Sequence, residues 1–224
     1  MLKRLIDLLL SFIALVVFLP FGLPIALVLR LTGEGEVFYP QQRVGKDGKL
    51  FPVYKFATML KESPNLGSGD ITVTNDPRVL PVGRFLRKTK LNEVPQILNI
   101  LFGTMSIVGP RPLTPRNFAY YSDEDQEIIG KMRPGLTGIG SIVFRDEESI
   151  IGRSDKPFEQ CYREDIAPYK AQLERWYYSH RGIVTDLLII AVTAWVVLRP
   201  SSTVYRKIWR DLPQPPAGLF AENA

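Results

Sequence analysis

The sequence has only one cysteine and one histidine in 224 residues. The single cysteine, Cys161, excludes an internal disulfide framework and a cysteine-rich zinc site. Cys161 lies in a polar, aromatic stretch, so we expect an ordinary packed or half-exposed thiol. The histidine, His180, stands near the end of a predicted helix, where a cation is favourable. No Ser–His–Asp triad and no histidine-rich metal site can be assembled from this sequence.

Acidic residues are fewer than basic ones, with 23 Asp and Glu against 28 Lys and Arg, which gives a formal charge of +5. Such a balance permits anionic partners, namely nucleic acid, anionic lipid or phosphorylated small molecules. The basic residues have no interleaved aromatics and match no known nucleic-acid module, so we expect no nucleic-acid partner. The length allows one ordinary domain with attachments, or at most two small domains.

Residues 5–29 form one apolar run, interrupted only by Asp7 and Ser11. At about 1.5 Å per residue, this run is long enough to cross a hydrocarbon layer about 30 Å thick. It is too long for the core of a cleaved signal peptide, and it ends in Leu29-Arg30-Leu31 without a cleavage site. Two interpretations remain: a helix that spans the bilayer, or a helix that enters and returns.

Two features favour the re-entrant interpretation. Pro20 and Pro24 fall inside the run, and an interior proline removes a backbone donor and bends the helix. Cations flank both ends of the run, Lys3 and Arg4 before it and Arg30 after it, so the positive-inside rule gives no gradient across the segment. If the chain bends and comes back, both ends are cytoplasmic. The residues alone leave both interpretations open.

A β-hairpin is predicted next. Residues 37–44 and 50–56 are rich in β-branched and aromatic side chains, and the Asp47-Gly48 turn lies between them. Lys55 comes near the end of the second strand, where a phosphate would be accessible. Residues 62–78 are rich in turn formers and predict a loop, with Arg78 at its close.

The stretch from Arg84 to Gly103 carries the strongest local pattern. Its apolar residues recur at helical spacing from position 94 to 101, with Asn92 as the predicted N-cap, Pro95 in the first turn and Gly103 just past the end. One acid, Glu93, stands among six basic residues: Arg84, Arg87, Lys88, Lys90, Arg111 and Arg116. A helix start surrounded by cations favours a phosphate or diphosphate ligand. The alternative is a surface helix with a solvated basic approach.

Further along, Ser122 is the predicted cap of a helix whose first turn is acidic. Residues 133–140 are rich in glycine but too irregular for a dinucleotide fingerprint. Residues 145–148 read Arg-Asp-Glu-Glu, and these carboxylates either help to hold magnesium or form a solvated charge cluster. The run from Leu187 to Leu198 is short for a span and predicts a helix docked on the domain or lying at the membrane interface.

Several short motifs, taken in order, resemble one family. They are Lys3-Arg-Leu-Ile-Asp7, Val37-Phe-Tyr39 with Arg43-Val-Gly45, Tyr54-Lys-Phe56, Asp76-Pro-Arg78, Gly83-Arg-Phe-Leu-Arg-Lys88, Leu91-Asn-Glu-Val-Pro-Gln96, Met105-Ser-Ile-Val-Gly-Pro-Arg-Pro112 and Arg133-Pro-Gly-Leu-Thr-Gly138. Each is weak alone, but together they cover nearly all of residues 2–190. The chain therefore resembles the bacterial sugar transferases, or monotopic phosphoglycosyl transferases.

The resemblance implies an α+β fold that is mostly helical and associated with a membrane. The expected parts are a re-entrant membrane helix bent at Pro20 and Pro24, a β-hairpin, and amphipathic helices in the interface. We expect the membrane helix over residues 1–31, a catalytic domain over residues 32–200 and a tail without ordered helix over residues 201–224. The implied location is the cytoplasmic face of a bacterial inner membrane.

The resemblance also implies a reaction. A sugar 1-phosphate moves from a nucleotide sugar, usually a UDP-sugar, to polyprenyl (undecaprenyl) phosphate, with Mg²⁺ as cofactor. The products are a polyprenyl diphosphate sugar and UMP, and the step initiates the assembly of exopolysaccharide, O-antigen or another glycan. The sequence leaves the sugar, and assembly into a homo-oligomer, open.

The predicted site has two parts. Asn92 and Glu93 stand at the family's catalytic pair, with Glu93 also as the expected metal ligand. The expected contacts to phosphate or substrate come from basic side chains: Lys55, Arg78, Arg84, Arg87, Lys88, Arg111, Arg133 and Arg145.

Position 92 departs from the family, whose catalytic pair is Asp-Glu with the aspartate as nucleophile. An amide is a poor nucleophile at phosphorus, whereas a carboxylate forms an acyl phosphate. Thr104 and Ala57 also replace an acid and a base that are common in the family. Four explanations are open. In the first, Glu93 or an acid from residues 146–148 is the nucleophile, and in the second the acceptor phosphate attacks the nucleotide sugar directly. In the third, position 92 has been altered, and in the fourth the chain is an inactive homologue that binds prenyl phosphate or a partner.

Overall fold

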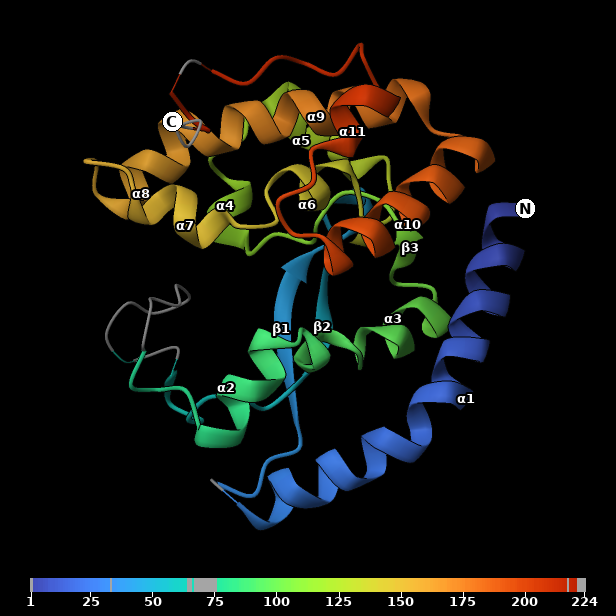
Figure 1. Cartoon of the computed structure of the whole chain (residues 1–224), viewed down its shortest axis with the longest axis vertical. Helices are drawn as coiled ribbons and strands as arrows, with labels where there is room; N and C mark the ends of the chain where they lie inside the picture. The colour runs from blue at the N-terminus through green and yellow to red at the C-terminus, as the bar shows by residue number, and fades with distance from the viewer. Residues whose placement is uncertain (1, 33, 64–65, 67–75, 217, 221–224) are drawn as a thin grey trace. The chain divides into compact units, whose positions relative to one another are not determined.

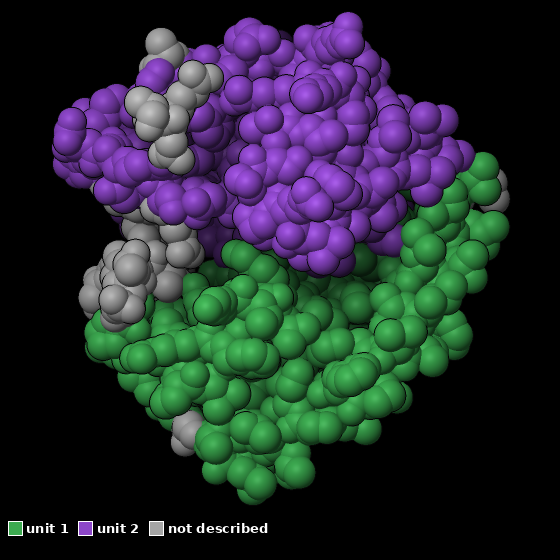
Figure 2. Space-filling model, in the orientation of Figure 1, with its two compact units in different colours: residues 1–42, 52–103 green, residues 43–51, 104–224 purple. Residues whose placement is uncertain are grey.

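The computed structural model describes residues 2–32, 34–63, 66, 76–216 and 218–220 (Figure 1). The chain divides into two compact units (Figure 2). Unit 1 comprises residues 1–42 and 52–103, and unit 2 comprises residues 43–51 and 104–224. The described chain is mostly helical with two short two-stranded sheets, which confirms the predicted α+β class. The boundaries proposed at residues 31 and 200 stay predictions.

Helix α1 (Leu2–Leu31) begins unit 1 and contains Pro20 and Pro24. Figure 1 shows that the helix changes direction along its length, as interior prolines predict. It is the one helix in the described ranges with the length and apolarity to cross a membrane. Asp7 and Ser11 are buried while most of the apolar side chains are exposed, an arrangement typical of a helix that faces lipid. Whether α1 spans or re-enters stays a prediction.

Helix α3 (Gln96–Phe102) packs against α1 within unit 1. The Arg4 guanidinium donates hydrogen bonds to the carbonyl oxygens of Ile100 (2.6 Å) and Leu101 (3.0 Å). These carbonyls belong to the last turn of α3, where a cation is favourable. Gly103 ends the helix in the left-handed region at φ 85°, so its predicted role is confirmed.

The predicted hairpin is also confirmed. Strands β1 (Phe38–Val44) and β2 (Leu50–Phe56) pair in one sheet. The short 3₁₀ turn η1 (Lys46–Gly48) connects them. Asp47 has φ 58° and Gly48 has φ 70°. An Asp-Gly pair adopts these left-handed conformations at low cost, and they turn the chain within a few residues.

A buried asparagine links the hairpin to α3. The Asn99 side chain is 1% exposed. Its Nδ2 donates to the Pro52 carbonyl oxygen (2.7 Å), and its Oδ1 accepts from the Tyr54 backbone N–H (2.9 Å). These two bonds extend the backbone pairing of β2 onto a helix, so α3 is fixed in register against the strand.

The start of the central helix differs from the prediction. Helix α2 (Pro81–Lys88) is followed by a separate 3₁₀ turn, η3 (Leu91–Glu93), and α3 begins only at Gln96. Asn92 therefore lies inside η3 and is not a helix cap. The chain turns sharply at Lys90, which has φ 60°, and the i→i+3 bonds of η3 leave Asn92 no N-terminal backbone group to cap.

Unit 2 is built around two short parallel strands, β3 (Ser106–Val108) and β4 (Gly135–Thr137). Ser106 pairs with Gly135 and Val108 with Thr137. The surrounding elements are α4 (Pro115–Phe118), α5 (Asp123–Gly130), α6 (Ile139–Val143), α7 (Glu147–Gly152), α8 (Phe158–Cys161), the π-helix η4 (Tyr162–Ile166), α9 (Ala167–His180), α10 (Ile183–Leu198) and α11 (Val204–Ile208).

Four local predictions for unit 2 are confirmed. The Ser122 side chain accepts from the Asp125 N–H and caps α5. Cys161 is buried in the hydrophobic core, and His180 is the last residue of α9. Helix α10 is docked on the unit by Ile189, with other apolar side chains of the same helix exposed.

The expectation of no ordered helix after Pro200 is wrong. Residues Val204–Ile208 form α11, and Tyr205, Trp209 and Leu212 join the core of unit 2. The Trp176 indole also donates a hydrogen bond to the Asp211 carboxylate (2.8 Å). The burial of large apolar side chains thus orders a segment whose prolines come only after it.

We predict that Asn99→Ala lowers the free energy of unfolding by about 2–4 kcal/mol, because it leaves a partly buried carbonyl and a partly buried N–H without partners. Thermal or urea unfolding in detergent, followed by circular dichroism, measures the change. Asn117→Ala, at a half-buried position on α4, is the control and should cost about 1 kcal/mol or less. Equal losses for the two variants would show that the Asn99 bonds do not hold α3.

Candidate phosphate-binding site

The predicted site residues are distributed over both units. Unit 1 contains Lys55, Arg78, Arg84, Arg87, Lys88, Asn92 and Glu93, and unit 2 contains Arg111, Arg133 and Arg145.

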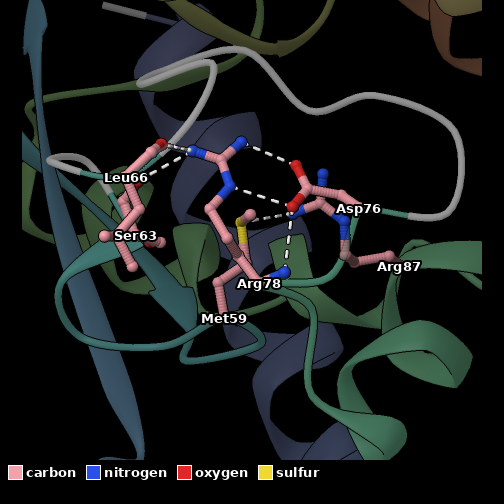
Figure 3. Close-up of polar contacts among 6 residues, drawn as sticks. All are labelled: Met59, Ser63, Leu66, Asp76, Arg78 and Arg87. Atoms are coloured by element: carbon pink, nitrogen blue, oxygen red, sulfur yellow. Dashed lines mark hydrogen bonds and ion pairs between the residues drawn. The ribbon is translucent and has the colours of Figure 1, made fainter.

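Arg78 and Asp76 form a buried ion pair in unit 1 (Figure 3). The guanidinium donates from Nε to Oδ1 (2.9 Å) and from Nη2 to Oδ2 (2.6 Å) of Asp76. Its Nη1 also donates to the carbonyl oxygens of Ser63 (2.8 Å) and Leu66 (2.7 Å). The hydrogen bond to Asp76 raises the pKa of Arg78. We call this four-residue arrangement the arginine clasp.

The arginine clasp occupies most of the donors of Arg78. A guanidinium has five N–H groups, and the bonds to Asp76, Ser63 and Leu66 use four of them. The clasp therefore joins the start of the predicted loop at 62–78 to its end, and most of that loop lies outside the described residues. The predicted phosphate contact of Arg78 stays a prediction, and its geometry shows a structural role.

The Arg87 side chain contacts Met59, whose segment is held in place by the arginine clasp. The Arg87 Nη1 lies 3.6 Å from the Met59 sulfur, as Figure 3 shows. Met59 forms an antiparallel bridge with Val79, and the Leu60 N–H donates to the Arg78 carbonyl oxygen (2.9 Å). The clasp, the bridge and α2 thus limit the positions that the Arg87 side chain can take.

Asn92 is the unusual residue of unit 1. It is 7% exposed, and its Oδ1 has no hydrogen-bond partner among the described residues. Lys90, two residues earlier, holds a left-handed conformation at φ 60°, which is uncommon for a residue other than glycine. Glu93 follows on the same turn and is half-buried. A buried acceptor without a partner favours a bound donor or cation.

The remaining predicted cations of unit 1 lie on two elements. On β2, the Lys55 Nζ donates to Gln41 Oε1 (3.2 Å). On α2, Arg84 and Lys88 are exposed. The structure thus keeps Arg84 and Lys88 in solvent and gives Lys55 a neighbour on the adjacent strand.

In unit 2, close backbone packing joins the two segments that carry the predicted cations Arg111 and Arg133. A Cβ added at Gly109 would lie 2.3 Å from the Arg133 carbonyl oxygen, and one added at Gly135 would lie 2.2 Å from the Gly109 nitrogen. The Gly135 N–H donates to the Pro110 carbonyl oxygen (2.8 Å). Only glycine permits this approach. The segments that carry the exposed side chains of Arg111 and Arg133 are therefore neighbours.

Two of the charged residues at 145–148, Arg145 and Glu147, are not simply solvated. Arg145 is half-buried, and its Nη2 lies 3.4 Å from the Val197 carbonyl oxygen. The Glu147 carboxylate pairs with Lys170 (2.7 Å), so one of the three acids is committed to an ion pair. In the described part of the chain, no three His, Cys, Asp or Glu side chains gather as a metal site.

A buried polar cluster lies within unit 2. Glu174 is 5% exposed, and burial raises its pKa to about 7, an effect that Lys170 and a hydrogen bond from the Arg111 backbone N–H partly offset. Burial likewise raises the pKa of Tyr121 and of Tyr162. Sequence reasoning missed this cluster. The i,i+4 spacing of Lys170 and Glu174 is also typical of a surface ion pair, and only the aromatic residues around it hint at burial.

Comparison with known proteins gives a family match: a profile described as bacterial sugar transferase matches residues 1–200. The undecaprenyl-phosphate galactose phosphotransferase of Salmonella typhimurium is 35% identical over 214 residues, 88% of this chain and 40% of that protein. The exopolysaccharide production protein PSS of Rhizobium leguminosarum is 35% identical over 199 residues, 84% of this chain and 91% of that protein.

A third relative is the UDP-glucose:undecaprenyl-phosphate glucose-1-phosphate transferase of Escherichia coli, 39% identical over 166 residues. These residues are 71% of this chain and 35% of that protein. The chain thus spans less than half of the enterobacterial relatives and most of the rhizobial one.

We predict that Asp76 and Arg78 are strongly coupled. Asp76→Asn and Arg78→Met should each lower the free energy of unfolding by about 3–5 kcal/mol, because each leaves one buried charge unpaired. The double variant should lose clearly less than the sum of the two, as urea unfolding in detergent would measure. The exposed pair Glu127–Lys131 is the control, with an expected coupling of about 0.5 kcal/mol. Additive losses at Asp76 and Arg78 would contradict a closed clasp.

Proposed function

The chain belongs to the bacterial sugar transferase family, and we propose that it transfers a sugar 1-phosphate from a UDP-sugar to polyprenyl phosphate. The products are a polyprenyl diphosphate sugar and UMP. The observation that carries the proposal is the match of the family over residues 1–200, together with relatives named as transferases of this type. We further propose that this step initiates the assembly of exopolysaccharide, O-antigen or a similar glycan.

The chemistry requires stabilisation of phosphate charge. In the transfer, an oxygen of the acceptor phosphate bonds to the phosphorus that carries the sugar, and the bond from that phosphorus to the UMP oxygen breaks. UMP leaves with the electron pair. Positive groups near the transferred phosphoryl stabilise this charge. We propose this role for Arg87 of α2, and the phosphate contacts of Arg111 and Arg133 stay predictions from the sequence.

Asn92 decides the route that we propose. Its amide does not form an acyl phosphate, so a covalent phosphosugar on residue 92 is excluded by its chemistry. Glu93 is the carboxylate that remains on the η3 turn. We therefore propose that the acceptor phosphate attacks the donor directly, with Glu93 as the essential acid of the site.

The donor atoms on η3 fit a magnesium ion. Mg²⁺ in phosphoryl-transfer sites is held by one or two protein oxygens together with substrate phosphates and water. The Glu93 carboxylate and the buried Asn92 Oδ1, which has no partner among the described residues, offer such oxygens. When bound, the ion would neutralise charge on the diphosphate of the donor.

A lipid acceptor requires access to a membrane. Helix α1 exposes apolar side chains over most of its length and buries Asp7 and Ser11, the two polar residues within its apolar run. We propose that α1 enters and leaves the bilayer on one side through its bend at Pro20 and Pro24. The catalytic residues would then lie at the cytoplasmic face of a bacterial inner membrane, where nucleotide sugars are present.

A second function is favoured by the amide at position 92. A homologue without the usual nucleophile can keep its substrate sites and act as a membrane-attached binding or scaffold protein. The two functions differ in one measurable quantity, the turnover of a UDP-sugar in the presence of undecaprenyl phosphate.

We predict that the purified chain, with Mg²⁺ and undecaprenyl phosphate, releases UMP from at least one member of a panel of UDP-sugars. Glu93→Gln should reduce this turnover by at least about 100-fold while membrane association is kept, because the charge of the essential acid is lost. Glu127→Gln, at an exposed position on α5, is the matched control and should stay near the rate of the unchanged chain. No UMP from any donor would support the scaffold function instead.

We predict that Asn92→Asp gives the chain a covalent intermediate. The new carboxylate should attack the donor in the absence of acceptor, and the adduct should add the mass of the sugar phosphate to residue 92. Peptide mass spectrometry without undecaprenyl phosphate measures this, with the unchanged chain as control. An adduct on Asn92 itself would contradict direct transfer, and turnover by the unchanged chain together with no adduct in the variant would show that position 92 does not face the donor.

A further inference from the structure

The first turn of α1 binds the C-terminal end of α3, which lies beside it (Figure 1). The Arg4 guanidinium donates to the carbonyl oxygens of Ile100 (2.6 Å) and Leu101 (3.0 Å). The last carbonyls of a helix have no partner within the helix, and a cation stabilises this end. A Cβ added at Gly103 would lie 3.3 Å from Arg4 Nη2, so the glycine that ends α3 also leaves room for the guanidinium.

The same face of α1 carries its buried polar side chains. Arg4 is half-buried, and Asp7 and Ser11 are buried. Their spacing of three and four residues places all three on one face of the helix, while Leu5 and Phe12 are exposed. Polar side chains in a membrane segment are costly in lipid and pair within the protein. This face of α1 is therefore built to meet protein, and its contact with α3 is not an accident of the anchor.

A second contact joins α1 to the η3 turn. Leu29 of α1 forms a buried cluster with Phe56 and Leu86, and Leu91, the first residue of η3, packs against this cluster. Helix α1 therefore contacts the chain on both sides of Glu93. It meets η3 through the cluster, and it meets the end of α3 through its first turn.

Backbone hydrogen bonds continue from η3 into α3. The Val94 N–H donates to the Leu91 carbonyl oxygen (3.2 Å), and the Ile97 N–H donates to the Val94 carbonyl oxygen (3.0 Å). Seven residues of helix extend only about 10 Å. A displacement of the C-terminal end of α3 is thus transmitted over a short, hydrogen-bonded segment to the turn that carries Glu93.

We propose that Arg4 is a positioning residue for Glu93: by fixing the end of α3 to α1, it sets the place of the η3 turn relative to the membrane segment. This inference rests on the proposed transferase function. The acceptor phosphate is carried by a lipid, so it reaches the site at a depth that the bilayer sets. An acid tied to the membrane helix is held at that depth. Loss of the guanidinium frees the end of α3, and small displacements of a reacting site reduce the rate strongly.

The first test is kinetic and uses the full chain in lipid nanodiscs that contain undecaprenyl phosphate. Arg4→Ala should lower kcat at least about tenfold and change KM for the UDP-sugar less than about threefold, because the geometry of the reacting groups is lost and donor binding is kept. Arg4→Lys keeps a cation at the helix end and should recover most of the loss.

Arg30→Ala is the matched control for this test. It removes the same charge from the other end of α1, where the guanidinium donates to the Gly35 carbonyl oxygen (2.7 Å), and its kcat should stay near that of the unchanged chain. An unchanged kcat in Arg4→Ala, or an equal loss in Arg30→Ala, overturns the proposal. Should Arg4→Ala fail to insert into nanodiscs, Arg4→Gln is measured in its place, because it keeps a donor without the charge.

The second test does not depend on turnover. Hydrogen exchange in nanodiscs, read by mass spectrometry, follows the Glu93 and Val94 amides, which are hydrogen-bonded within the turn. Arg4→Ala should speed their exchange at least about fivefold, while the Thr89 amide at the end of α2 stays as protected as before. Unchanged exchange at Glu93 and Val94, or equal acceleration at Thr89, overturns the proposal. Absent turnover by the unchanged chain would contradict the proposed function, and exchange would still decide whether Arg4 holds the turn.

Discussion

The double hydrogen bond of Asn99 to strand β2 is the constraint on which unit 1 depends. A helix and a strand edge ordinarily meet through apolar side chains, which fix distance but tolerate sliding. Asn99 instead satisfies a backbone carbonyl at Pro52 and a backbone N–H at Tyr54. A shift by one residue would break both of these partly buried bonds. Helix α3 is therefore held in one register, and this also fixes the position of the η3 turn that precedes it.

The same helix also receives the membrane segment. Arg4 donates to carbonyls at the C-terminal end of α3, while Asn92 and Glu93 precede its N-terminal end. The position of α1 and the position of the predicted catalytic pair thus both depend on α3, a short helix of seven residues. A change in the tilt or depth of α1 would reach the pair through α3. The fold in this way couples the membrane segment to the chemistry without a long connecting element.

The parts of the structure that local chemistry decides were predictable from the sequence. The Asp47-Gly48 turn, the Gly103 helix end and the Ser122 cap each follow from the conformations that one or two residues prefer. The parts that tertiary burial decides were not. Asn92 has the propensity of a helix cap, but the sharp turn at Lys90 places it inside η3. Burial of Trp209 orders a segment that proline content alone assigns to a tail. The burial of Glu174 in the core of unit 2 leaves no mark in local spacing.

The burial of Asn92 bears on whether the site is kept or decayed. An unpartnered buried amide oxygen costs about 1–3 kcal/mol, and Lys90 adds the cost of a left-handed conformation. A position without a task is more stable with an apolar side chain that packs, and an unstrained turn is more stable than this one. The structure instead keeps both unfavourable features, the unpartnered Asn92 oxygen and the left-handed Lys90, next to Glu93. Local strain and an orphan acceptor at one turn are typical of a site that a ligand completes, and this favours a binding role for Asn92 over loss of function.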